Sequence, residues 1–190
     1  MIVNHEYSGQ PNTRYISGFS GSESVVVITP KKKIIMTDGR YYLQSKQEAK
    51  HFTLVKYNKV KYKDSAKTLK MIQQMRIVKN EQELRNMQKA ADISIIAFKR
   101  LLPLISPGVS ELWLAARLEL FMKEEGSPKM AFDTIVASGK NGAMPHAQPT
   151  TKKIQRGELI TIDFGATYNG YMSDITRTVG IGKLPTKLID

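Results

Sequence analysis

The stretch "DFGATYNGYMSDITRT", residues 163–178, decides the fold of the second half of this chain. An Asn-Gly pair divides it, and Asn-Gly between strand-forming segments is the strongest short-range signal for a two-residue β-hairpin turn. With Asn169 and Gly170 at the turn, Tyr168 faces Tyr171 across the hairpin. The sequence therefore predicts two antiparallel strands in a fixed register.

This register brings two carboxylates together. Asp163 falls opposite Thr176, and Asp174 lies two residues before Thr176 on the second strand. Because side chains alternate along a strand, all three share one face, and the carboxylates become diagonal neighbours with Cα atoms about 7–8 Å apart. Gly165 falls opposite Asp174 and leaves space beside it, unless a one-residue bulge alters the register.

Two converging anions on a half-buried face require compensation by a shared proton or by divalent cations. Arg177 points to the opposite face in this register and is therefore not an obvious counterion. We therefore predict a metal site with Asp163 and Asp174 as ligands, and with the Thr176 hydroxyl orienting Asp163. The alternative is that either carboxylate simply faces water at a sheet edge.

His146 is the candidate catalytic residue. It stands in "AMPHAQP" between Pro145 and Pro149, and proline on both sides restricts the backbone that presents the imidazole. Near a metal site such a histidine can shuttle a proton or bind a substrate oxygen. The alternative is an ordinary surface histidine on a loop.

Composition bounds the class of protein. The 190 residues are 41% hydrophobic, which is enough for a core, and they contain no cysteine, which excludes disulfides and thiolate metal sites. The net charge of +12 favours acidic partners, but most of the excess is lysine spread along the chain, as on a solvated surface. Apolar runs such as Val25–Ile28 are far short of the roughly 20 residues of a membrane span. We expect a cytoplasmic protein with no membrane contact.

The predicted elements fall into three parts. Short β-branched runs and a helix from about residue 40 predict a small α/β unit over residues 1–57. Residues 58–78 are basic and weakly patterned, which predicts a linker and the start of a helix. Residues 79–190 open with a capping box at Asn80 and Glu83, continue with a second helix capped by Ser110, and end in strands. The fold class is α+β.

Several of these segments resemble the Xaa-Pro aminopeptidase and prolidase family, whose catalytic domain has the pita-bread, or creatinase-like, fold. The segments that resemble the catalytic domain are "RIVKNEQELRNMQKAADIS", "FDTIVASGKNGAMPHAQPT" and "GELITIDFGATYNGYMSDITRTVGIG". Two others, "TRYISGFSGSESVVVITP" and "MTDGRYYLQSKQEA", are similar to the family's amino-terminal domain. The resemblance implies a partial creatinase-like α/β domain followed by the first half of a pita-bread domain.

The resemblance also implies a chemistry. Two divalent ions, most often manganese, with cobalt or zinc as alternatives, would activate a bridging hydroxide against the peptide bond before proline. Asp163 and Asp174 match the family's first two metal ligands, and His146 matches its histidine near the scissile bond. The implied partner is a peptide with proline at its second position, and the family admits a homodimer.

The chain departs from the family pattern in three respects. Residues 175–190 contain no His or Glu, whereas the family completes its site with a histidine and two glutamates from the second half of the domain. The helix and strand expected ahead of "RYISGF" are missing, and the stretch between "FTLVKY" and "RIVKNEQE" is short. We therefore expect a truncated copy or a fragment, with little or no peptidase activity by itself.

The alternative interpretation is a non-catalytic homologue of this family that binds nucleic acid or protein partners. Relatives that have lost the metal site bind nucleic acid or protein partners, and the charge of +12 suits such a role. A nucleic-acid partner is not the favoured expectation, because Asp163, Asp174 and His146 are all present.

Overall fold

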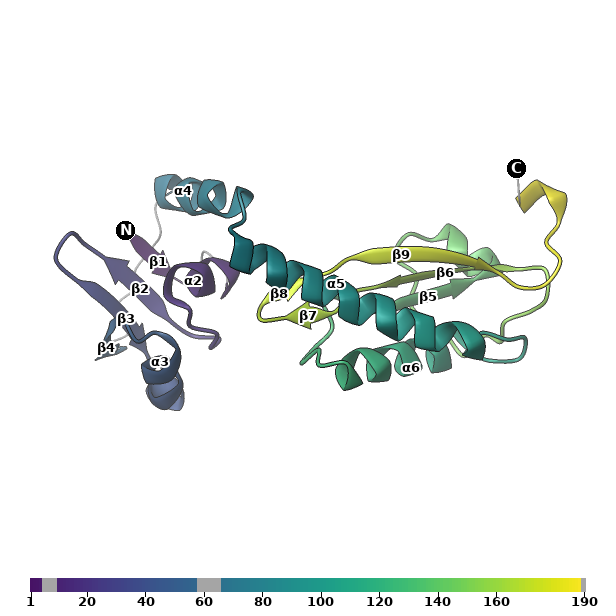
Figure 1. Ribbon diagram of the computed structural model, residues 1–190, viewed down its shortest axis with the longest axis horizontal. Coiled ribbons are helices and arrows are strands. Elements are labelled where there is room, and N and C mark those ends of the chain that lie inside the picture. The colour runs from purple at the N-terminus through teal and green to yellow at the C-terminus, as the bar shows by residue number, and fades with distance from the viewer. Residues whose placement is uncertain (5–9, 58–65, 189–190) are drawn as a thin grey trace. The chain divides into compact units, whose positions relative to one another are not determined.

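The computed structural model describes residues 1–4, 10–57 and 66–188, and the chain forms two compact units, Met1–Lys79 and Asn80–Asp190 (Figure 1). Residues 58–65 of the expected linker lie outside the described residues. No helix in the described ranges combines the length and the apolar character needed to cross a membrane.

The first unit is a four-stranded sheet with helices packed on it. Its strands are β1 (Ile2–Asn4), β2 (Val25–Ile28), β3 (Lys33–Thr37) and β4 (Thr53–Lys56), in the order β1-β2-β3-β4. Its helices are α2 (Gln10–Ser17), η1 (Gly39–Tyr41), α3 (Tyr42–Glu48) and α4 (Ala66–Ile77). Only β3 and β4 pair in parallel among these strands, and η1 with α3 makes the crossover that a parallel pair requires. The expected absence of a strand ahead of "RYISGF" is wrong, because β1 lies there.

Helix α4 contributes to the core of the first unit. Ile72 is fully buried in that unit's core beside Phe19 and Ile35. The Arg76 guanidinium donates a hydrogen bond to Asn12 Oδ1 at 2.6 Å. The part of the predicted linker that the structure describes is therefore a helix that helps to close this core.

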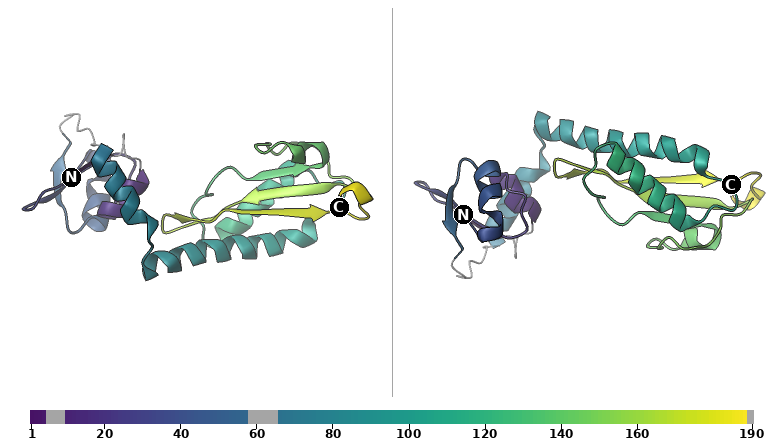
Figure 2. Two further views of the ribbon diagram at one scale, coloured as in Figure 1. Left: turned by 90° about the horizontal axis from the view of Figure 1, so that it is seen from above. Right: turned by 90° about the horizontal axis from the view of Figure 1, so that it is seen from below.

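The second unit places two helices against one face of an antiparallel sheet (Figure 2). The helical elements are α5 (Glu81–Leu101), η2 (Leu102–Leu104), α6 (Glu111–Glu124), η3 (Gly139–Ala143) and η4 (Thr186–Leu188). The strands are β5 (Ile135–Ser138), β6 (Leu159–Phe164), β7 (Thr167–Tyr168), β8 (Tyr171–Met172) and β9 (Ile175–Gly180). The main sheet has the order β5-β6-β9, and β7 with β8 forms a separate two-stranded ribbon. The predicted α+β class is confirmed.

Both predicted helix caps are present. Asn80 Oδ1 accepts a hydrogen bond from the Glu83 amide at 2.9 Å, and Glu83 Oε2 accepts one from the Asn80 amide at 2.8 Å. Ser110 Oγ accepts from the Trp113 amide at 3.2 Å. These bonds satisfy amides that the first turn of a helix leaves without partners.

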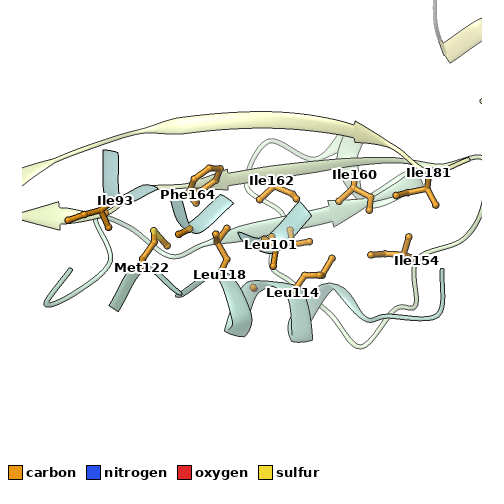
Figure 3. Packing of buried hydrophobic residues seen from close by; sticks show 14 residues of the cluster. Ile93, Leu101, Leu114, Leu118, Met122, Ile154, Ile160, Ile162, Phe164 and Ile181 are labelled. Carbon is orange, nitrogen blue, oxygen red and sulfur yellow. The ribbon is translucent and has the colours of Figure 1, made fainter. Parts of the chain in front are cut away.

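The core of the second unit fixes the orientation of β6. Ile160, Ile162 and Phe164 are fully buried and point toward Leu114 and Leu118 (Figure 3). Burial of each such side chain contributes about 1.5–3 kcal/mol to the free energy of unfolding. The face on which each side chain of β6 lies is therefore strongly fixed. The intervening residues of β6, among them Asp163, therefore lie on the face away from the helices.

Candidate metal centre

The predicted hairpin turn and register are confirmed. Tyr168 pairs with Tyr171, and Asp163 pairs with Thr176. Asn169 and Gly170 have φ values of +46° and +81°, which is the backbone that a type I′ turn requires at both central positions. Asparagine and glycine adopt this backbone most readily, so the sequence explains the turn.

The sequence had suggested one continuous second strand. The structure instead divides it into β8 and β9, because the pairing is interrupted beside Gly165. The Gly165 carbonyl accepts from the Ala131 amide at 2.8 Å, outside the hairpin. A Cβ on Gly165 would lie 2.0 Å from the Ser173 carbonyl oxygen, so the two backbones approach more closely than any other residue allows. The register is the same on both sides of this break, and Asp174 remains opposite Gly165.

Contacts with α5 establish which way the hairpin side chains point. Ser173 Oγ lies 2.8 Å from Ser94 Oγ of α5, so the Ser173 side chain faces the helices. Its neighbour Asp174 is exposed and, by alternation, lies on the opposite face. Asp163 follows the same rule relative to buried Phe164, and the two carboxylates share one face of the sheet.

Thr176 makes the contact that the register predicts. Its hydroxyl donates a hydrogen bond to Asp163 Oδ1 at 2.8 Å. In the described ranges, neither Asp163 nor Asp174 forms an ion pair, and Arg177 instead donates to the Thr176 carbonyl oxygen at 2.8 Å. Both carboxylates thus keep free oxygen lone pairs without a basic partner there.

This donor set fits part of a divalent-cation site. Carboxylate oxygens are the hard donors that Mn²⁺ and similar ions take, and a hydroxyl that orients one of them is a usual companion. No cluster of three or more His, Cys, Asp or Glu suited to a metal occurs among the described residues. Asp163 and Asp174 therefore fit two ligands of a centre whose other positions need further donors.

His146 lies at the tip of a tight turn. The Ala147 amide donates to the Met144 carbonyl at 3.2 Å, and Pro145 occupies the second position, where its fixed φ suits such a turn. Ala147 is only 4% exposed, which anchors the chain directly after the exposed imidazole. No hydrogen bond joins His146 to Asp163 or Asp174 in the described structure.

The His146 loop leaves the sheet on the carboxylate face. A Cβ on Gly142, in η3, would lie 3.6 Å from Thr161 Oγ1. Thr161 precedes Asp163 by two residues on β6 and shares its face. The structure joins Thr176 to Asp163, and strand alternation places Asp174 on the same face. The start of the histidine loop lies over the same side of the sheet.

Sequence reasoning missed Glu111, which is fully buried at the start of α6. Its carboxylate accepts hydrogen bonds from Ser138, Asn141 and Thr150, on both sides of the His146 turn. Burial alone would raise the pKa of Glu111, but bonds from Thr150, Ser138 and Asn141 outweigh it and hold the pKa below its ordinary value. The sequence gives no sign of this, because an acidic residue after a helix cap is ordinarily exposed.

Comparison with known proteins places the chain in a family. Residues 85–190 match the sequence profile of metallopeptidase family M24, and residues 1–93 match that of the creatinase/prolidase N-terminal domain. The chain belongs to metallopeptidase family M24. The predicted order, a creatinase-like domain followed by pita-bread structure, is confirmed.

Individual M24 relatives support the same assignment. The chain is 32% identical over 208 aligned residues to the uncharacterized peptidase YqhT of Bacillus subtilis, covering 90% of this chain and 59% of that protein. It is 43% identical over 124 residues to a Xaa-Pro dipeptidase of Pyrococcus horikoshii, covering 65% and 35% respectively. The crystal structure of an X-Pro aminopeptidase from Thermotoga maritima superposes with a TM-score of 0.83 at 33% identity, covering 99% of this chain and 64% of that one. The chain thus spans less than two thirds of the length of these relatives.

Proposed function

We propose that this chain supplies the first two carboxylate ligands and the substrate-binding histidine of a metal-dependent Xaa-Pro peptidase. The observation that carries the proposal is the hydrogen bond from Thr176 to Asp163 on a hairpin whose other carboxylate, Asp174, shares the same face. Membership of family M24, together with relatives named for Xaa-Pro peptidase activity, supports the choice of chemistry.

Asp163 and Asp174 would hold divalent cations, with manganese favoured and cobalt or zinc as alternatives. Such ions, when bound, supply an activated water and polarise the scissile carbonyl. The chain's own contribution is preorganisation, because the Thr176 hydroxyl restricts how the Asp163 carboxylate can rotate.

His146 would bind the substrate and handle a proton at the scissile bond. Its exposure at the tip of a proline-restricted turn leaves the imidazole free to meet a substrate atom. A histidine changes charge near neutral pH, so it can either donate to a carbonyl oxygen or take up a proton there. The substrate would be a peptide with proline at its second position.

The isolated 190-residue polypeptide should hydrolyse such peptides slowly or not at all, since its two carboxylates leave most coordination positions to water. The test is hydrolysis of an Xaa-Pro dipeptide with added Mn²⁺, followed by chromatography, beside an intact prolidase. Turnover comparable to that of the prolidase would contradict this part of the proposal. Mn²⁺ binding that survives replacement of both aspartates would contradict the site itself.

One observation favours a second candidate, a non-catalytic role in binding nucleic acid or protein. The net charge of +12 favours polyanions through release of counterions. Titration of an oligonucleotide at two salt concentrations, beside the Mn²⁺ titration, separates the two candidates. Tight, strongly salt-dependent binding without a response to Mn²⁺ would favour this second role.

A further inference from the structure

The loop that carries His146 leaves the sheet at Ser138 and returns beside α6 at Thr150, and both ends meet one carboxylate. Glu111 Oε1 accepts from the Ser138 amide at 2.7 Å, and Glu111 Oε2 accepts from the Thr150 amide at 3.1 Å. We propose that Glu111 is a positioning residue that clamps residues 138–150 and so fixes where His146 meets the substrate. The catalytic meaning of this clamp rests on the proposed function.

The clamp requires a carboxylate. Both oxygens face backbone N–H groups, which can only donate, and each oxygen also accepts from a hydroxyl, Ser138 Oγ at 2.8 Å or Thr150 Oγ1 at 2.6 Å. Asn141 Nδ2 donates to both oxygens, at 3.2 and 3.1 Å. A glutamine at 111 would turn its own NH₂ donor toward one of the backbone donors. One end of the loop would then lose its partner.

Glu111 is itself held firmly. It is the first residue of α6 after the Ser110 cap, and its own amide donates to the Lys152 carbonyl at 3.1 Å. The next amide, of Leu112, donates to the Thr150 carbonyl at 2.9 Å. The positive end of the helix favours an ionised carboxylate at this position. Side chain and backbone therefore bind the same returning segment.

A second layer of charge supports the clamp. The Lys152 ammonium donates to Ser138 Oγ at 2.8 Å and pairs with Glu158 at 2.8 Å. Lys152 thus shares Ser138 with Glu111, and Glu158 is the counterion of Lys152. Their opposite charges offset each other, which leaves the Glu111 carboxylate to balance the donors of the loop.

The clamp acts on His146 through the loop. Glu111 makes no hydrogen bond with His146, and between the clamped ends the chain is held by the Met144–Ala147 turn and by buried Ala147. Release of either end would leave the turn intact but let it move as a unit. Glu111 is therefore a positioning residue and not a catalytic one.

Trypsin provides the first test, because Lys140 is the only Lys or Arg between residues 139 and 151. Cleavage after Lys140 requires local opening of the loop, so its rate reports the clamp when reclosing is fast. We expect Glu111→Gln to raise this rate about tenfold, because a buried backbone donor loses its acceptor. The control is Glu119→Gln on the same helix, which should match wild type. Equal rates in all three proteins would overturn the proposal.

The second measurement follows His146 itself by NMR of ¹³C-histidine-labelled protein. We expect the His146 imidazole signal in Glu111→Gln to shift and lose its single, narrow line. Ile93→Val, a core variant away from the loop, controls for a general loss of stability and should leave that signal unchanged. If Glu111→Gln fails to fold, Thr150→Val and Asn141→Ala remove single donors and should give the same change to a smaller degree. An unchanged His146 signal in these variants would overturn the proposal.

These tests need no metal, so they separate the clamp from the proposed function. If Glu111→Gln frees the loop while wild type binds no Mn²⁺, the clamp stands and the peptidase proposal fails. If wild type binds Mn²⁺ while Glu111→Gln changes neither the cleavage rate of the loop nor the His146 signal, the peptidase proposal stands and the clamp is overturned.

Discussion

The Asp163 carboxylate has one oxygen held by Thr176, which restricts its rotation before any ligand arrives. Removal of this hydroxyl keeps the strand-favouring shape but frees the carboxylate. Thr176→Val should therefore weaken Mn²⁺ binding by about 10–100-fold, the usual effect of losing such a support, as measured by calorimetry. Thr178→Val, two residues further on the same face, is the matched control. Equal affinities in the two variants would show that the hydroxyl does not prepare the site.

Glu111 predicts a specific pH dependence of stability. Its folded pKa lies below the ordinary value of 4.5, so its contribution is fully present above that value and is lost as pH falls through the folded pKa. At pH 7, Glu111→Gln should lower the free energy of unfolding by about 1–3 kcal/mol, and the gap to wild type should narrow below about pH 4.5. Urea unfolding at several pH values measures this. A gap that is constant down to pH 3 would contradict the assignment.

At the scale of elements, the hairpin depends on the close approach at Gly165. Gly165→Ala would place a Cβ 2.0 Å from the Ser173 carbonyl oxygen, a backbone atom that cannot simply rotate away. We expect the free energy of unfolding to fall by about 1–3 kcal/mol or more, by analogy with overpacking in a core. Gly39→Ala is the control, because its Cβ meets nothing within 4 Å. Thermal unfolding of both variants checks this, and equal melting temperatures would contradict the structural role of Gly165.

The hairpin could be predicted from sequence because local rules determine it. Asn169-Gly170 sets the turn, the turn sets the register, and the register puts Asp163 opposite Thr176. The break beside Gly165 could not be predicted, because its cause is non-local: the partner of the Gly165 carbonyl is Ala131, in another segment. The turn and the register depend only on the two paired strands, so a contact with a third segment cannot be predicted from them.

The Glu111 clamp could not be predicted for a similar reason. The neighbouring Ser110 could be predicted as a helix cap, since its hydrogen bond from the Trp113 amide spans only three residues. The partners of Glu111 lie 27 and 39 residues away in sequence and meet it only after the sheet has packed on α6. For residues 58–78 the sequence predicted a linker and the start of a helix, but the weak apolar pattern did not show that helix α4 belongs to a core. That role depends on the burial of Ile72 against the first sheet.

At the scale of the whole molecule, the two units have separate cores, one around Ile35 and one around Leu118. Truncation of either side chain to alanine should cost about 2–5 kcal/mol in its own unit. Because the two residues share no partner, the effects should stay local. Amide hydrogen exchange followed by mass spectrometry should show faster exchange in residues 1–79 for Ile35→Ala and in residues 80–190 for Leu118→Ala. Loss of protection throughout in either variant would contradict the independence of the units.

The most direct test of the metal centre is to locate bound Mn²⁺ by its paramagnetic effect on the amide signals of the ¹⁵N-labelled chain. The site proposed here predicts that signals around residues 163–165 and 173–176 broaden first, and that an Asp163→Asn, Asp174→Asn double variant loses this effect. Broadening that is strongest elsewhere, or unchanged in the double variant, would contradict it.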